Sequence, residues 1–319
     1  MILKLLLIFF VKNKKGMVVF MKRIILQLFQ WKLSDIISHL KEIEGAGYNF
    51  IQISPIQPTK DNGYEWWKLY QPLDFSIGNS QIGTREDLIE LCEKAKKCGL
   101  GIICDVVVSH MATKNDNPLE PNEKVNKTLL VRNDFWKEKK LISNWENRKE
   151  VITLSNGMPC LDLKNHDLQD IIINFLNELV DCGVSGFRFD SAKSIALPSE
   201  GSDFWVRVPN SIKNKDIFMY AEVIFSNKEL IDEYNKYIDV ATTSPSSDNS
   251  KIVSYVENHD TFLEFGFTKD MNIYDISNEW RKLSNIYNNL LFYARPFSDD
   301  WKNDCIKNIN LANSLELAV

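Results

Sequence analysis

The residues of this sequence best suited to chemistry are an arginine and an aspartate, Arg188 and Asp190. A helical pattern of apolar residues precedes them over residues 167–182, and a short strand is predicted to end at Asp190. Residues two apart on a strand share a face, so both side chains point the same way. Burying charged groups costs free energy, so a pair of them on the inner face of a strand suggests a functional site. A structural ion pair is the alternative.

Carboxylates and histidines also occur at the ends of three other predicted strands. They are Asp105 and His110, Glu222, and the Glu-Asn-His-Asp segment 257–260. A single polar residue after a strand is usually a turn residue or a helix cap. The same property at four strand ends indicates one shared site.

The elements that must position these residues alternate between strand and helix. The continuous apolar run at residues 101–108 is typical of a strand in a parallel sheet. Eight strands are predicted, at residues 23–29, 50–54, 101–108, a short run ending at 190, 217–223, 237–241, 252–257 and 289–294. The expected fold class is therefore α/β, a (β/α)8 TIM barrel, in which active sites lie at the carboxyl ends of the strands.

Two helix starts carry capping signals. Ser34 precedes apolar residues at helical spacing and is predicted to cap their helix. Thr84 to Asp87 form a capping-box pattern, which predicts the start of a helix that runs through Lys97.

One polar segment, residues 111–160, interrupts the alternation and predicts a short irregular insertion after the third strand. The barrel would then comprise residues 21–110 and 161–319. Residues 1–20 form a leader of uncertain status, because Met17 and Met21 are also plausible starts and no cleavage site follows the apolar run.

Composition narrows the class of protein. The chain has 319 residues, 44% of them hydrophobic, and a net charge of −5 without a basic block, which argues against a nucleic-acid partner. The apolar start is too short to span a bilayer, so no membrane partner is expected. The six cysteines are scattered without a close pair, which favours a cytoplasmic protein over a secreted one. We expect a monomer.

The motifs resemble those of the alpha-amylase family of glycoside hydrolases. The matching segments are residues 105–110, residues 186–193, Glu222 and residues 257–260, in the family's order. Residues 66–72 are similar to the substrate-lining segment of bacterial and animal alpha-amylases. The resemblance extends over nearly the whole chain, from about Ile24 to Pro296.

The resemblance implies three catalytic residues. Asp190 would attack the anomeric carbon as a nucleophile, kept ionised by Arg188. Glu222 would be the general acid and then the base, with a raised pKa. Asp260 would stabilise and distort the sugar at the transition state. The family retains anomeric configuration, so the carboxyls of Asp190 and Glu222 would lie about 5–5.5 Å apart.

The resemblance also implies seven substrate-binding side chains. These are Trp67, Tyr70, Gln71, His110, Arg188, Lys193 and His259. The two histidines would hydrogen-bond hydroxyls of the central glucose and the tyrosine would stack on it. The lysine would reach the leaving-group side, and Gln71 and Trp67 would line the cleft. Hydrophobic packing is the alternative for Trp66 and Trp67.

Family members usually bind a structural calcium ion between barrel and insertion. Here Ser109, Cys160 and Ser194 stand at ligand positions where the family has other residues, although the third supplies only a backbone carbonyl. A thiol is a poor calcium ligand, so the site is expected to be absent or very weak, with no cofactor. A shifted alignment would offer Asp162 instead.

The expected function is retaining hydrolysis of internal α-1,4-glucosidic bonds in starch or glycogen. A transglycosylase or a hydrolase of short oligosaccharides is the alternative within the family. The family's β-sandwich after the barrel is expected to be missing, since residues 303–319 suffice for one helix. An inactive carbohydrate-binding remnant is a third possibility, which the missing domain supports and the intact Asp190, Glu222 and Asp260 oppose.

Overall fold

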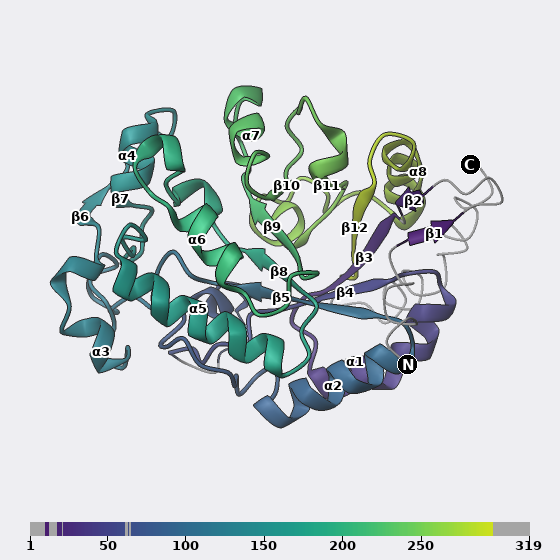
Figure 1. Ribbon diagram of the computed structural model, residues 1–319, viewed down its shortest axis with the longest axis horizontal. Coiled ribbons are helices and arrows are strands. Elements are labelled where there is room, and N and C mark those ends of the chain that lie inside the picture. Colours follow the sequence, from purple (N-terminus) through teal and green to yellow (C-terminus); the bar gives the residue numbers. More distant parts are fainter. Residues whose placement is uncertain (1–9, 13–17, 21, 61–62, 64, 296–319) are drawn as a thin grey trace.

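The barrel predicted from the sequence is present. The computed structural model describes residues 10–12, 18–20, 22–60, 63 and 65–295. Eight parallel strands close into a barrel in chain order (Figure 1). They are β3 (Arg23–Leu28), β4 (Phe50–Ile53), β5 (Gly101–Val106), β8 (Gly186–Phe189), β9 (Phe218–Glu222), β10 (Asp239–Ala241), β11 (Ile252–Tyr255) and β12 (Asn289–Tyr293). The fold is therefore a (β/α)8 TIM barrel.

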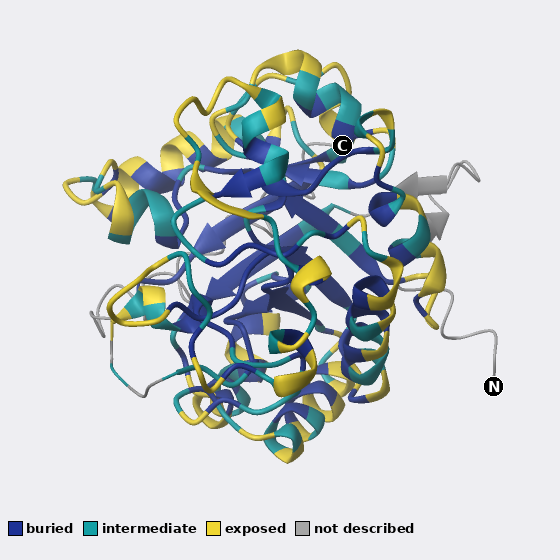
Figure 2. Cartoon of the chain, turned by 90° about the vertical axis from the view of Figure 1, so that its left-hand side faces the viewer, coloured by how far each residue is buried: buried dark blue, intermediate teal, exposed yellow. Residues whose placement is uncertain are grey.

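Helices surround the barrel and cover its outer face. They are α1 (Leu33–Gly45), α2 (Arg85–Lys97), α5 (His166–Asp181), α6 (Phe204–Ser211), α7 (Lys228–Tyr234) and α8 (Ile273–Ser284). Short helical turns occur in the loops: η1 (Trp66–Tyr70), η3 (Ala192–Ser194), η4 (Pro198–Glu200), η5 (Asn249–Lys251) and the π-turn η6 (Asp260–Glu264). Figure 2 shows buried strands inside and helices whose exposed residues face outward.

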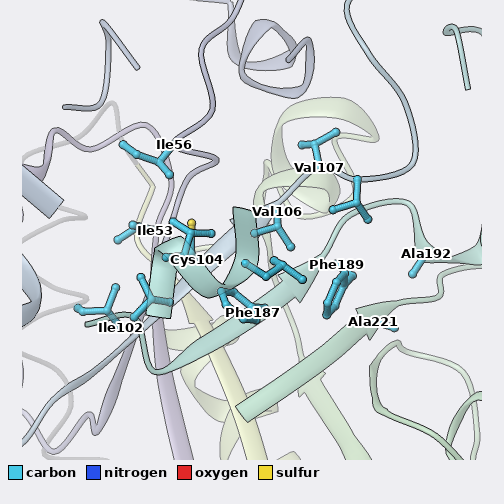
Figure 3. Close-up of a cluster of buried hydrophobic side chains, with 14 of the residues drawn as sticks. Ile53, Ile56, Ile102, Cys104, Val106, Val107, Phe187, Phe189, Ala192 and Ala221 are labelled. Atoms are coloured by element: carbon cyan, nitrogen blue, oxygen red, sulfur yellow. The ribbon is translucent and has the colours of Figure 1, made fainter. Parts of the chain in front are cut away.

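Strand alternation divides the core into two layers. Outward side chains such as Cys104, Phe187 and Phe189 belong to the large cluster between strands and helices, part of which Figure 3 shows. Inward side chains such as Ile103 and Phe218 form a smaller cluster inside the barrel. Arg188 lies between Phe187 and Phe189, so it faces the interior, as the sequence predicts.

The predicted capping box at Thr84 is confirmed, and the predicted helix cap at Ser34 is wrong. Thr84 caps α2, with reciprocal hydrogen bonds between Thr84 and Asp87. Helix α1 begins at Leu33, one residue before the predicted cap, so Ser34 lies inside the first turn. The N–H of Leu33 donates to the carbonyl of Ile82 at 2.9 Å, which satisfies a group that a side-chain cap would otherwise serve.

The segment between β5 and α5 is more ordered than the sequence pattern indicates. It contains α3 (Lys127–Leu130), η2 (Asn133–Phe135), β6 (Glu138–Leu141), α4 (Arg148–Thr153) and β7 (Leu154–Ser155). Strands β6 and β7 pair in a separate two-stranded sheet. These elements lie together at one side of the barrel in Figure 1.

Some predictions fall at the chain ends. Near the start, β1 (Phe10–Lys12) and β2 (Val18–Phe20) pair antiparallel. The rest of the predicted leader, and residues 296–319 with the predicted last helix, lie outside the described residues. Within the described ranges, no helix is both long and apolar enough to cross a bilayer.

Candidate active site

One guanidinium organises the mouth of the barrel. Nη1 of Arg188 donates to both carboxylate oxygens of Asp105 at 2.9 Å and to Oδ1 of Asp190 at 2.8 Å. Nη2 donates to Oε1 of Glu222 and lies 3.9 Å from Oδ2 of Asp260. The three predicted catalytic residues therefore gather around one cation, together with a fourth carboxylate.

Strand pairing explains why these side chains meet. In the parallel register, Asp105 of β5 pairs with Arg188 of β8, which pairs with Tyr220 of β9. Glu222 lies two residues beyond Tyr220 and so shares its inward face. Asp190 follows β8 directly, and its N–H donates to the carbonyl of Val106 at 3.0 Å. Asp260 begins η6, which follows β11.

Glu222 has the electrostatic character of a general acid. Burial raises its pKa to about 7, although Arg188 opposes that shift. The N–H of Ser191 donates to Oε2 of Glu222 at 2.9 Å. Burial also raises the pKa of Asp260, but His259, Arg188 and a hydrogen bond with Glu222 outweigh it, so the net direction is downward. The proton therefore resides on Glu222 rather than on Asp260 near neutral pH.

Asp190 differs from the expectation that Arg188 alone would keep it ionised. The ion pair is present, but burial raises the pKa of Asp190 well above its usual value, and the charges of Glu222 and Asp105 add to this. One cation does not balance all the surrounding carboxylates, so the cluster retains a proton.

His259 belongs to a hydrogen-bond relay at the same mouth. The side-chain amide of Gln27 contacts its Nδ1 at 2.9 Å, and its Nε2 lies 2.7 Å from the hydroxyl of Tyr70 and 3.2 Å from Oδ1 of Asp260. The backbone N–H of His259 donates to Oε1 of Gln27, so the amide nitrogen donates to Nδ1 and the ring proton is assigned to Nε2. The Tyr70 hydroxyl then donates onward to Asp105 at 2.9 Å.

His110 supports the backbone of the neighbouring segment. Its Nε2 donates to the carbonyl of Tyr70 at 3.0 Å, and its Nδ1 contacts the hydroxyl of Ser109 at 3.0 Å. Burial lowers its pKa to about 4, so the ring is neutral at physiological pH. Nε2 also lies 4.0 Å from Oδ2 of Asp190.

The aromatic segment makes contacts that the sequence did not predict. Trp66, rather than Trp67, contacts the site, with its ring 6.1 Å from that of His259; Trp67 is 43% exposed beside Lys68. Tyr70 is buried, and its ring packs parallel to His259. Gln71 is also buried, where its side-chain oxygen accepts the N–H of Thr113 at 2.8 Å. Gln71 thus ties this segment to the insertion instead of lining a cleft.

Lys193 lies in η3, in the loop that follows Asp190. Its ammonium donates to the carbonyl of Phe225 at 2.8 Å, in the loop after β9. This bond joins the loops that follow β8 and β9, which carry Asp190 and Glu222 respectively.

Several site residues were not predicted as such from the sequence. A cavity at the barrel mouth is lined by Gln27, Gln52, Arg188, Tyr220, Glu222, Tyr255, Asn258 and His259, among others. Asp105 belongs to a recognised motif, but only the structure shows that both its oxygens bind Arg188. The inward positions of the predicted strands were the signal that would have identified Gln52 and Tyr220.

The residues at the expected calcium positions do not fit that ion. The Cys160 thiol contacts Oδ1 of Asn156 at 3.1 Å, and the Ser109 hydroxyl binds His110. The Ser194 carbonyl accepts a hydrogen bond from the Lys137 ammonium at 2.7 Å. Burial lowers the pKa of Lys137 to about 8, so it remains mostly charged at neutral pH. A thiol and a cationic side chain are the opposite of the hard oxygen ligands that calcium requires.

Sequence comparison identifies related proteins. The family described as "Alpha amylase, catalytic domain" matches residues 30–313. The alpha-amylase of Clostridium acetobutylicum is 31% identical over 306 residues, covering 86% of this chain and 40% of that protein. The chain therefore spans less than half the length of this relative.

Solved structures share the barrel. An alpha-amylase from Geobacillus thermoleovorans complexed with acarbose matches with a TM-score of 0.72 and 18% identity, covering 92% of this chain and 79% of that one. A cyclomaltodextrin glucanotransferase matches with a TM-score of 0.77 and 15% identity, covering 94% and 80%. At these identities the likeness shows a common fold alone.

Proposed function

Since this chain belongs to the alpha-amylase family of glycoside hydrolases, we propose that it hydrolyses internal α-1,4-glucosidic bonds of starch-like or glycogen-like glucans with retention of configuration. The observation that carries the proposal is the arrangement around Arg188. One guanidinium nitrogen holds Asp190 and the other holds Glu222, so the two carboxyls are close neighbours. A retaining mechanism needs two neighbouring carboxyls, of which the second is the nucleophile.

In the first step, Asp190 attacks the anomeric carbon while Glu222 gives its proton to the glycosidic oxygen. Arg188 holds Oδ1 of Asp190, so we assign the attack to Oδ2. The C–O bond to the leaving sugar breaks, and a covalent glycosyl ester on Asp190 forms. The pKa of about 7 keeps much of Glu222 protonated for this step.

In the second step, Glu222, now ionised, takes a proton from water, and the water oxygen attacks the anomeric carbon. The ester bond breaks, and Asp190 is restored as a carboxylate. Asp260, held ionised beside Arg188 and His259, stabilises the positive charge that develops on the sugar ring in both steps.

Two assays on purified protein test the proposal. Cleavage at internal bonds should abolish the iodine colour of soluble starch while little reducing sugar has formed. A maltooligosaccharide blocked at its non-reducing end should also be cut. Asp190→Asn should reduce both activities by at least about 10⁴-fold, because the nucleophile is lost.

A matched control is Asp181→Asn, which removes an exposed carboxylate paired with Lys213 and should leave activity unchanged. Release of sugar only from unblocked ends would indicate an exo-acting glucosidase. Transfer to added sugar acceptors in place of hydrolysis would indicate a transglycosylase. Folded wild-type protein without activity on any α-glucan would contradict the proposal.

A further inference from the structure

The loop that follows β8 begins with a residue in an unfavourable backbone conformation. It runs from Ser191 to Ile195 and includes η3. Ser191 adopts a left-handed backbone conformation with φ of 48°, which is unfavourable for a residue with a Cβ atom. This conformation aims the N–H of Ser191 at Glu222. The position of the acid therefore depends on a strained turn that its surroundings must hold.

Two cationic side chains of the insertion bind the carbonyl oxygens of this loop. Lys137, just before β6, donates to Ser194 at 2.7 Å. Arg148, the first residue of α4, donates to the carbonyl of Lys193 and, at 3.2 Å, to that of Ile195. Three consecutive backbone carbonyls are thus held by charged donors, the strong class of hydrogen bond.

Both cations are themselves fixed. Arg148 forms two hydrogen bonds with the carboxylate of Glu200, at 2.7 and 2.9 Å, and one with the hydroxyl of Tyr234 at 3.0 Å. The backbone N–H of Lys137 donates to the carbonyl of Cys160 at 2.9 Å. The ammonium of Lys137 lies 3.5 Å from the carbonyl of Val151 in α4. The insertion therefore presents a rigid pair of donors to the loop.

We propose that Lys137 and Arg148 are positioning residues that clamp the loop after β8, and that the Lys137 ammonium does there what a bound divalent cation would otherwise do. A divalent metal ion and an ammonium group can each join the insertion to the barrel by attracting carbonyl oxygens. The ammonium is part of the chain, so the junction needs no dissociable ion. Its effect on turnover rests on the proposed function, whereas its effect on the loop does not.

Hydrogen exchange of the full-length protein, read by mass spectrometry over residues 191–197, tests the clamp without any substrate. The N–H groups of Ser194 and Ile195 bond within the turn and report its opening. Lys137→Met keeps the apolar stem and removes the charged donor, so exchange there should accelerate about tenfold. Lys137→Arg should restore most of the protection. Lys140→Met, at an exposed position of β6, is the matched control and should behave as wild type.

Calcium chloride and a chelator form the second arm of this experiment. Neither should change exchange or melting temperature of the wild-type protein. If Lys137→Met does not fold, Lys137→Gln, which retains a neutral donor, should fold and show intermediate protection. Exchange of the Met and Gln variants equal to wild type would overturn the proposal. Faster wild-type exchange with chelator, reversed by calcium, would overturn it too.

Kinetics form the third arm. Lys137→Met should lower kcat on an α-1,4-glucan about tenfold with a smaller change in KM, since the acid is misplaced while the sugar-binding groups outside this loop remain. An equal loss in Lys140→Met, or a change confined to KM, would contradict positioning. If the wild-type protein is inactive, the proposed function fails, and the exchange experiment still decides whether the clamp exists.

Discussion

At the scale of single residues, Arg188 is the group on which the site depends. It is buried and holds Asp105, Asp190 and Glu222 by direct hydrogen bonds. Removing one partner of a buried ionic cluster leaves uncompensated charge, which costs much more than losing an exposed pair. The arginine therefore stabilises the fold while it orders the carboxyls that we propose to be catalytic.

Arg188→Met should lower the free energy of unfolding by about 3–5 kcal/mol at neutral pH. The loss should become smaller at acidic pH, because protonation of the carboxyls removes their repulsion. Urea unfolding at several pH values measures both effects. Lys213→Met, which breaks the exposed pair with Asp181, is the control and should cost less than about 1 kcal/mol. A small, pH-independent loss for Arg188→Met would contradict this account of the cluster.

The pKa of Glu222 determines the pH dependence of the first step. Activity requires the protonated acid, and the pKa is raised to about 7, so kcat should fall as pH rises through this value. The measurement is a pH–rate profile with a maltooligosaccharide. The same profile with α-glucosyl fluoride, whose leaving group needs little protonation, should lack the alkaline limb. A limb shared by both substrates would assign the titration to another group.

The sequence indicated the identity of the site residues better than their contacts. Asp190, Glu222 and Asp260 could be found because polar residues at strand ends must share the barrel mouth. The hydrogen-bond partners of Gln71 and Tyr70 could not be predicted, because Thr113 and Asp105 lie far away in the chain. Which of two adjacent tryptophans faces the site depends on the course of η1, and no residue pattern records it.

At the scale of elements, close strand packing constrains β8. A Cβ atom on Gly186 would lie 2.8 Å from the carbonyl oxygen of Phe218 and 2.9 Å from Cγ1 of Ile103. Both distances are shorter than ordinary contacts, and the carbonyl belongs to the backbone of β9. The first residue of β8 must therefore be small for Arg188 to keep its place between β5 and β9.

Gly186→Ala should destabilise the protein by about 1–3 kcal/mol, the usual cost of overpacking. Chemical denaturation measures the change. Gly45→Ala at the end of α1, where an added Cβ meets no atom within 4 Å, should be neutral or stabilising by up to about 1 kcal/mol. Equal effects of the two substitutions would refute the packing argument.

Helix boundaries show when local sequence is sufficient. The capping box at Thr84 was predictable because both of its hydrogen bonds lie within four residues. The start of α1 was not, because the N–H of Leu33 is satisfied by Ile82, almost fifty positions away. Similarly, β5 ends before its apolar run does, where the N–H of Val107 turns to the side chain of Gln57.

At the scale of the whole molecule, the barrel follows from repetition. Eight predicted parallel strands, most of them separated by helical segments, admit few arrangements, so the closed sheet could be predicted without its exact strand ends. The insertion could not, because its short elements are held by contacts such as those of Lys137 and Arg148 with the loop after β8. These contacts join residues far apart in the chain, so no local sequence pattern indicates them.

We propose that Asp190 and Glu222 of this chain together cleave α-glucosidic bonds with retention. The most direct test is proton NMR of the first product released from an α-1,4-linked maltooligosaccharide, recorded before mutarotation, with Asp190→Asn as control. We expect the α-anomer to appear first in the wild type and the variant to release none. Initial formation of the β-anomer, or undiminished release by Asp190→Asn, would contradict it.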